Sequence, residues 1–289
     1  IDFAKRAGAA GPNQIKQLRQ MSAEDLQKIV KEGYASAGNF YPVVDGHYLP
    51  KSTFETFQDG DHANVPLIIG NNDDEFSFFH SVLPMPLLEY AEVDQPTDRL
   101  PDYMTDEYGE DVERLKELYP GLETLDSVAV ARFQGDYFFC AASRFYVGEM
   151  AHEDLDTTAP VYYYRFRRKS PLEGEVGGAF HAADLPFVFG ALHSPVFASD
   201  EADNELAEIM QSYWTNFAKT GNPNGPSLPE WDTFSADGDP QWMILDRDTV
   251  GMQAIDLEEN FEILTARIQR TIDTVRKEDS LLHTQSSVA

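Results

Sequence analysis

The stretch Val65-Pro-Leu-Ile-Ile-Gly-Asn-Asn-Asp-Asp-Glu75 decides how this chain is expected to fold. Its apolar, β-branched first half predicts a buried strand over 65–70. Gly70 and two asparagines then break the apolar run, and three acidic residues follow. In open α/β sheets, ligands bind beyond the carboxyl ends of the strands. The stretch therefore predicts a strand that delivers Glu75 to the edge where such a sheet carries its chemistry.

Two later segments, 161–166 and 241–246, combine β-branched and aromatic residues and are expected to be strands as well. Helical patterns separate the strands: residues 76–150 are mostly helical, and an amphipathic helix opens near Asp200. Strands that alternate with helices indicate an α/β fold, a mostly parallel sheet with helices on both faces. Three strands are few for 289 residues. We therefore expect the C-terminal part of a larger sheet.

Shorter elements are expected towards both ends of the chain. A capping-box pattern that opens at Ser22 predicts a helix over 23–32. Residues 43–49 have two apolar pairs around Asp-Gly and predict a short hairpin. A helical seam of apolar residues predicts a long helix at 257–275. The polar residues 279–289 are expected to form a loose tail.

The composition limits the kinds of partner. The chain has 22 basic against 50 acidic residues, a net charge of -28. Such a surface repels phosphate backbones, so no nucleic-acid partner is expected. No apolar run reaches the roughly 18 residues of a spanning helix, so no membrane partner is expected. The chain starts without Met and without an apolar signal core, which suggests a processed protein or a fragment and leaves its compartment open.

Glu75 and His181 are the candidate catalytic pair. Glu75 lies beside phenylalanines, and a carboxylate amid aromatic rings is unfavourable unless it is paired. His181 lies between a glycine-rich loop and the apolar segment 185–189. A histidine after one strand, paired with an acid after another, is how a general base is held and oriented. Each residue taken alone also fits a structural role, Glu75 as a solvated turn acid and His181 as a structural histidine.

The remaining sequence predicts neither a metal nor another cofactor. The other histidines lack metal-ligand spacing, and no glycine-rich nucleotide loop occurs. The single cysteine, Cys140, lies in an apolar helical context and is expected to be a buried, inert thiol. The strand-to-helix elbow Gly-x-Ser-x-Gly is also absent, and the nearest approach, Tyr34-Ala-Ser-Ala-Gly38, lacks the first glycine. The pair therefore lacks a serine nucleophile within this sequence.

Four stretches, in the same order, resemble the type-B carboxylesterases, an α/β-hydrolase family that includes cholinesterases, bacterial para-nitrobenzyl esterases and the non-catalytic neuroligins. The stretches are 40–50, 65–75, 178–190 and 213–224. The resemblance implies that residues 1–289 are the C-terminal portion of one carboxylesterase domain, with 76–150 as a helical cap or insertion. It also implies that Glu75 is the triad acid and His181 the triad base.

The resemblance further implies the reaction and its partners. In the family, the nucleophilic serine and the oxyanion glycines lie in the N-terminal half, so they should precede residue 1. The implied activity is serine-type hydrolysis of a small-molecule carboxylic ester through an acyl-enzyme. The missing N-terminal half is then a required partner, and this chain alone is expected to be inactive. The final helix, 257–277, could also pair two copies of the chain.

Phe76, Phe78 and Phe79 are the expected substrate contacts. Phe78 and Phe79 stand where family members often place aromatic residues, and Phe76 adds bulk near the acyl or alcohol pocket. Phe76 and Ala182 stand where the family commonly has glycine. The bulk of Phe76 is expected to change the shape of the pocket there, whereas Ala182 is a mild change. Two alternatives remain: a non-catalytic, cholinesterase-like binding or adhesion module, and a free-standing small fold. Retention of both Glu75 and His181 argues against the binding module.

Overall fold

The computed structural model describes residues 2–30, 42–77, 79, 102–152, 159–169, 179–193 and 199–286. The chain forms two compact units, Ile1–Ser52 and Thr53–Ala289. The first unit contains short helices: α1 (Asp2–Arg6), η1 (Gly11–Asn13), α2 (Gln14–Leu18) and α3 (Ala23–Ile29). The Oγ atom of Ser22 accepts the N–H of Asp25 at 3.1 Å, which confirms the predicted start of α3.

The predicted hairpin at 43–49 is wrong. Oδ1 of Asp45 accepts the backbone N–H groups of His47, Tyr48 and Leu49 at 2.9, 2.8 and 3.1 Å. A side chain that binds its own neighbouring backbone in this way competes with a strand ladder. Val43 and Val44 are largely exposed, so no burial of apolar surface favours a strand either. The stretch is a turn organised by one carboxylate.

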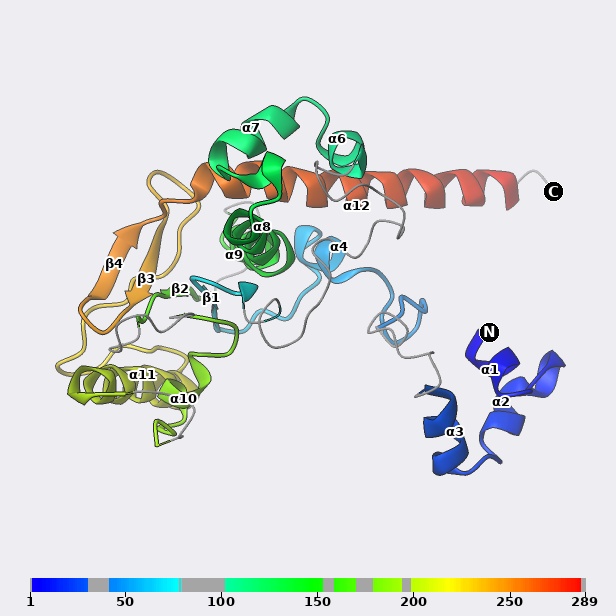
Figure 1. Ribbon diagram of the computed structural model, residues 1–289, viewed down its shortest axis with the longest axis horizontal. Helices are drawn as coiled ribbons and strands as arrows, with labels where there is room; N and C mark the ends of the chain where they lie inside the picture. The colour runs from blue at the N-terminus through cyan, green and yellow to red at the C-terminus, as the bar shows by residue number, and fades with distance from the viewer. Residues whose placement is uncertain are drawn as a thin grey trace. The chain divides into compact units, whose positions relative to one another are not determined.

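The second unit is built on a four-stranded sheet in the order β1-β2-β3-β4 (Figure 1). Its strands are β1 (Leu67–Asn72), β2 (Val161–Phe166), β3 (Gln241–Leu245) and β4 (Val250–Ala254). The pairs β1–β2 and β2–β3 are parallel, and β4 returns antiparallel to β3. The mostly parallel sheet is therefore confirmed, whereas β4 was not predicted.

Strand β1 is shifted by two residues from the predicted range. Pro66 has no N–H to donate, and the first ladder bond runs from the N–H of Leu67 to the carbonyl of Pro160 at 3.0 Å. The strand then continues through Gly70 and ends at Asn72, beyond the point where the apolar run stops. Pairing with β2, rather than the local apolar pattern, sets the end of the strand.

Helices cover both faces of the sheet, as the alternation along β2 requires. Tyr162, Tyr164 and Phe166 belong to the cluster that includes apolar residues of α10 (Leu185–Val188) and α11 (Glu201–Thr220). Val161 and Tyr163 point the other way, into the cluster formed with α9 (Ala141–Met150) and α12 (Glu258–Ser286). Figure 1 shows α11 on one side of the strands and α9 with α12 on the other.

The region expected to be a helical insertion is helical where it is described. It contains α6 (Asp102–Tyr108), α7 (Asp111–Leu118), η4 (Leu122–Thr124), α8 (Ser127–Gly135), the π-helix η5 (Asp136–Cys140) and α9, and α4 (Thr53–Gln58) precedes it in the second unit. Residues 78 and 80–101 of this region lie outside the described residues. Its assignment as a cap remains a prediction.

Helix α12 confirms the predicted apolar seam as far as Ile272 but not at Val275, which is exposed, and the helix is longer than predicted. Phe261, Leu264, Ile268 and Ile272 are buried in the cores of this same unit. The helix continues to Ser286, so the loose tail predicted from 279 is wrong for most of its length. Pairing of two copies through this helix would have to use its other residues and stays a prediction.

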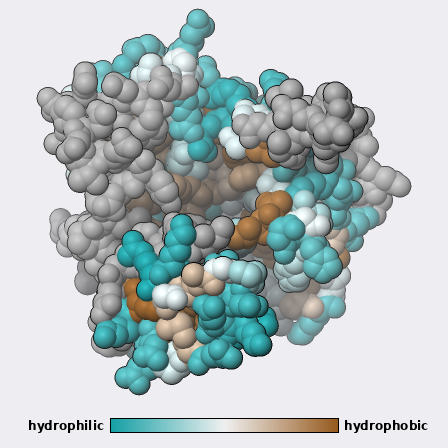
Figure 2. Space-filling view, turned by 90° about the vertical axis from the view of Figure 1, so that its right-hand side faces the viewer, coloured by the Kyte–Doolittle hydropathy of each residue, from teal (hydrophilic) through white to brown (hydrophobic). Residues whose placement is uncertain are grey.

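On the face shown in Figure 2, hydrophilic residues make up most of the coloured surface. This agrees with the large negative net charge of the chain. Among the described helices, α12 included, none is both long and apolar enough to cross a membrane.

Candidate active site

Glu75 and His181 are in contact. Oε2 of Glu75 lies 2.7 Å from Nδ1 of His181, within the range expected for an oriented base. The Glu75 side chain is 7% exposed and the His181 side chain 38%. Glu75 is therefore a buried, paired carboxylate rather than a solvated turn acid. The imidazole, by contrast, keeps an accessible side while its Nδ1 faces the acid.

The end of β1 holds the carboxylate from the other side. The backbone N–H of Asn72, the last residue of the strand, donates to Oε1 of Glu75 at 2.7 Å. Both carboxylate oxygens thus have a partner, one on the backbone and one on the imidazole. A carboxylate held at both oxygens keeps one orientation, and this is what an orienting acid needs.

The histidine segment is joined to the turn after β1. Asp74 and Phe180 form an isolated parallel bridge, and the N–H of Asp74 donates to the carbonyl of Ala179 at 2.9 Å. Ala182, directly after the histidine, has φ of +66°. This left-handed conformation is unfavourable for a residue with a Cβ atom. The alanine at this position therefore leaves the backbone beside His181 strained.

A buried arginine anchors the acidic turn. Nε of Arg165 lies 3.1 Å from Oδ1 of Asp73, and its Nη2 donates to the Asp73 carbonyl at 3.2 Å. The guanidinium also donates to Sγ of Cys140 at 3.0 Å and lies 3.9 Å from Asp136. Burial alone would lower the pKa of Arg165, but the acidic side chains of Asp136 and Asp73 raise it above its usual value. The turn that carries Glu75 is thus fixed to the π-helix through a charged side chain.

The prediction that Cys140 is a buried thiol is confirmed. Burial raises its pKa well above the usual range, and the nearby Arg165 offsets only part of that shift. The thiol is therefore neutral, and a neutral thiol is a poor nucleophile.

Aromatic rings surround the imidazole. The ring of Phe79 lies 5.1 Å from that of His181, centroid to centroid, and the ring of Phe139 lies 4.8 Å away. Phe76 is 5% exposed and stacks on Phe138 at 5.5 Å. Phe78, the third predicted substrate contact, lies outside the described residues. Phe79 alone of the predicted contacts is thus seen against the imidazole.

The sequence reasoning missed Phe139. Helical periodicity gave no sign of it, because the π-helix η5 changes the direction of its side chains within an otherwise α-helical run. π-helical turns often occur at functional sites, and here the turn carries Asp136, Phe139 and Cys140. The sequence feature that could have pointed to Phe139 is the pair of phenylalanines directly before the single cysteine.

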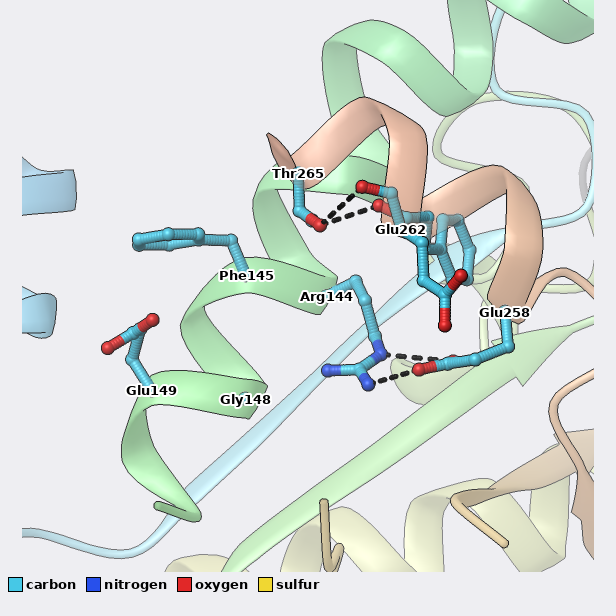
Figure 3. Close-up of a pocket in the computed structure, with 8 residues that line it drawn as sticks. Arg144, Phe145, Gly148, Glu149, Glu258, Glu262 and Thr265 are labelled. Atoms are coloured by element: carbon cyan, nitrogen blue, oxygen red, sulfur yellow. Dashed lines mark hydrogen bonds and ion pairs between the residues drawn. The ribbon is translucent and has the colours of Figure 1, made fainter. Parts of the chain in front are cut away.

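A separate pocket of about 150 Å³ lies between α9 and α12 (Figure 3). Its polar lining is three glutamates, Thr265 and Arg144, whose guanidinium bonds both oxygens of Glu258. Burial raises the pKa of Glu149 on its rim. The pocket is lined by neither Glu75 nor His181. Among the residues that the structure describes, no three His, Cys, Asp or Glu side chains are grouped as metal ligands.

Comparison with known sequences agrees with this fold. A family profile described as "Carboxylesterase family" matches residues 2–264. Among curated relatives, the pyrethroid hydrolase Ces2e of Rattus norvegicus is 31% identical over 251 residues, which is 79% of this chain and 40% of that protein. The cocaine esterase of Homo sapiens is 30% identical over 234 residues, 75% of this chain and 39% of that protein.

Solved structures agree as well. Carboxylesterase EST55 of Geobacillus stearothermophilus matches with a TM-score of 0.69 at 24% identity, over 91% of this chain and 53% of that one. A PNB esterase matches with a TM-score of 0.66 at 25% identity, over 91% and 52% of the two chains. The chain thus spans about 40% of the curated relatives and about half of the solved chains. With its helix-covered, mostly parallel sheet and its family match over residues 2–264, this chain belongs to the carboxylesterase family and has an α/β-hydrolase fold.

Proposed function

We propose that this chain supplies the acid and the base of a serine carboxylesterase. The main support for this proposal is the 2.7 Å contact between Oε2 of Glu75 and Nδ1 of His181. With Nδ1 engaged, Nε2 is the nitrogen left to take a proton from a serine and return it to the leaving alcohol. Glu75 fixes this tautomer and stabilises the imidazolium that forms. The reaction is ester hydrolysis through an acyl-enzyme.

The nucleophile in this proposal comes from a segment outside the 289 residues. The sequence contains no Gly-x-Ser-x-Gly elbow and no oxyanion glycine motif. Acid, base and nucleophile act as a unit, so loss of the nucleophile removes nearly all activity. The chain by itself is therefore inactive, and the segment that carries the serine is its obligatory partner.

The substrate is a small ester with an apolar group. The rings of Phe79 and Phe139 beside the imidazole support this, because they give the reacting group an apolar wall. Two relatives are named for the compounds they act on, a pyrethroid hydrolase and a cocaine esterase, which agrees with a small ester.

The test compares the 289-residue chain with the protein expressed from its complete reading frame. Both are assayed for hydrolysis of p-nitrophenyl acetate and p-nitrophenyl butyrate. We expect saturable turnover that an organophosphate blocks in the complete protein, and none in the chain alone. His181→Gln should lower kcat at least about a thousandfold, as removal of a triad member does in other serine hydrolases. Glu75→Gln should lower kcat with little effect on KM.

His193→Gln is the matched control, because His193 is a histidine outside the Glu75–His181 contact. It should retain the activity of the unchanged protein. Organophosphate-sensitive turnover by the chain alone would overturn the proposed division of roles. An inactive complete protein would instead favour the non-catalytic binding module.

A further inference from the structure

We propose that Asn72 is the positioning residue of the Glu75–His181 pair: its backbone holds the acid while its side chain holds the histidine segment. The proposal deepens the proposed function and rests on it for its catalytic consequence. Asn72 is the last residue of β1 and is 2% exposed. It touches neither reacting atom and acts through its two neighbours.

The backbone of Asn72 bonds to the acid, and its side chain bonds to the segment that carries the histidine. Its N–H donates to Oε1 of Glu75 at 2.7 Å. Its side-chain Nδ2 donates to the carbonyl of Phe180 at 2.8 Å. Phe180 directly precedes His181, so this second bond fixes the backbone from which the imidazole projects. One residue therefore sets the distance between the carboxylate and the ring.

A second set of contacts keeps the Asn72 amide in place. Nδ2 also donates to Oδ1 of Asp184 at 3.3 Å, and Oδ2 of Asp184 accepts the hydroxyl of Tyr164 at 3.0 Å. Tyr164 pairs with Gly70 across the sheet, and its ring lies over that glycine so closely that a Cβ atom there would come within 2.3 Å of it. The amide thus meets two acceptors whose positions are set by the sheet.

These contacts distinguish Asn72 from an ordinary buried asparagine. Asn71 precedes it on the same strand and is similarly buried at 7%. Successive strand residues face opposite sides, and the buried Oδ1 of Asn71 has no hydrogen-bond partner among the described residues. The two asparagines therefore share residue type, strand and burial. Asn72 is the one that bonds to both segments of the site.

The first test measures the contact itself on the 289-residue chain, without any assay of activity. A proton on Nδ1 that is held against Glu75 gives a low-field ¹H resonance, which His181→Gln assigns by removing it. In Asn72→Leu, which keeps the backbone N–H but loses both side-chain bonds, we expect this resonance to be lost or to exchange at least tenfold faster. Asn71→Leu should retain it. Circular dichroism and thermal unfolding establish that each variant is folded.

Asn72→Ser serves the same comparison if the leucine variant does not fold, because serine is small and too short to reach the Phe180 carbonyl.

The second test measures kinetics in the complete protein. Asn72→Leu should lower kcat about tenfold or more with KM changed less than threefold, because the histidine is displaced and the substrate wall is kept. Asn71→Leu should leave both values within about twofold.

The outcomes separate the proposal from the function on which it rests. An unchanged Nδ1 resonance in folded Asn72→Leu or Asn72→Ser overturns the positioning role, whatever the complete protein does. A lost resonance in a complete protein without esterase activity supports the positioning role and contradicts the proposed function. Equal effects of the Asn71 and Asn72 variants would mean that the strand matters and the amide does not.

Discussion

Nδ1 of His181 lies 2.7 Å from Oε2 of Glu75, although 106 positions separate the two residues in the chain. The sheet brings these two distant parts of the chain together. Strands β1 and β2 lie side by side in parallel, and the residues that follow each of them meet at the Asp74–Phe180 bridge. The contact is therefore a product of strand pairing, and changes that disturb pairing should disturb it.

Relief of the strain at Ala182 should stabilise the chain. A φ of +66° destabilises an alanine by about 1–2 kcal/mol. Glycine removes this strain, but the greater flexibility of glycine in the unfolded state offsets about 0.4–1 kcal/mol of the gain. Ala182→Gly is expected to raise the free energy of unfolding by up to about 1 kcal/mol, measured by urea denaturation. Ala183→Gly, at a buried neighbour without a positive φ, should lower it. Destabilisation by both would contradict the argument.

The ion pair between Arg168 and Asp203 should matter more than exposed pairs. Nε and Nη2 of Arg168 meet the two Asp203 oxygens at 3.1 and 3.0 Å, and both side chains are almost fully buried. Arg168→Met leaves a buried carboxylate without its cation and should cost about 3–5 kcal/mol of unfolding free energy. Asp203 also caps α11, so the pair is best removed from the arginine side.

The comparison for this pair is Arg114→Met. Arg114 pairs with Glu259 while both side chains are about half exposed. Its loss should cost much less unfolding free energy than the loss of Arg168, because solvent screens an exposed pair. Equal costs for the two variants in urea denaturation would show that burial does not set the strength of these pairs.

Gly70 should not accept a side chain. A Cβ atom there would lie 2.3 Å from the Tyr164 ring, so Gly70→Ala must displace that ring or separate the strands. We expect a loss of about 1–3 kcal/mol in unfolding free energy, the usual range for overpacking. Gly251→Ala, on β4 of the same sheet, has no atom within 4 Å of the added Cβ and should be nearly neutral. Matching losses at the two glycines would argue against the close approach.

The turn at Asp45 should respond to acid. Backbone hydrogen bonds from His47, then from Leu49 and Tyr48, hold the pKa of Asp45 below its usual value. Because the folded pKa is the lower one, the ionised carboxylate stabilises the turn above the unfolded pKa of about 3.9, and this contribution is lost as pH falls through the folded pKa. Amide resonances of the three donors should titrate together with a midpoint below about 3.9. Asp45→Asn should abolish the transition, and a midpoint above that value would contradict the assignment.

The contact between the acid and the histidine could be predicted because each of them follows a strand of the sheet. All six residues of β2 are buried, and the β-branched and aromatic residues among them predicted its bounds correctly. The acid and the histidine each follow a strand, and parallel strands bring such residues to one edge. The end of β1 at Asn72 could not be predicted, because pairing with β2 extends the strand beyond its apolar residues. The contact of Phe139 with His181 depends on a π-helical turn, for which a periodic pattern has no signal.

The separation of 106 positions between Glu75 and His181 also sets the order of events during protein synthesis. At roughly 5–20 residues per second, the ribosome adds the histidine about 5 to 20 s after the acid. For most of that interval β1 has no β2 to pair with, because its partner begins only at Val161. The Glu75 carboxylate must therefore stay hydrated, or be shielded by a chaperone, until the later segment emerges. Translation speed between the two codons thus sets the earliest moment at which this site can form.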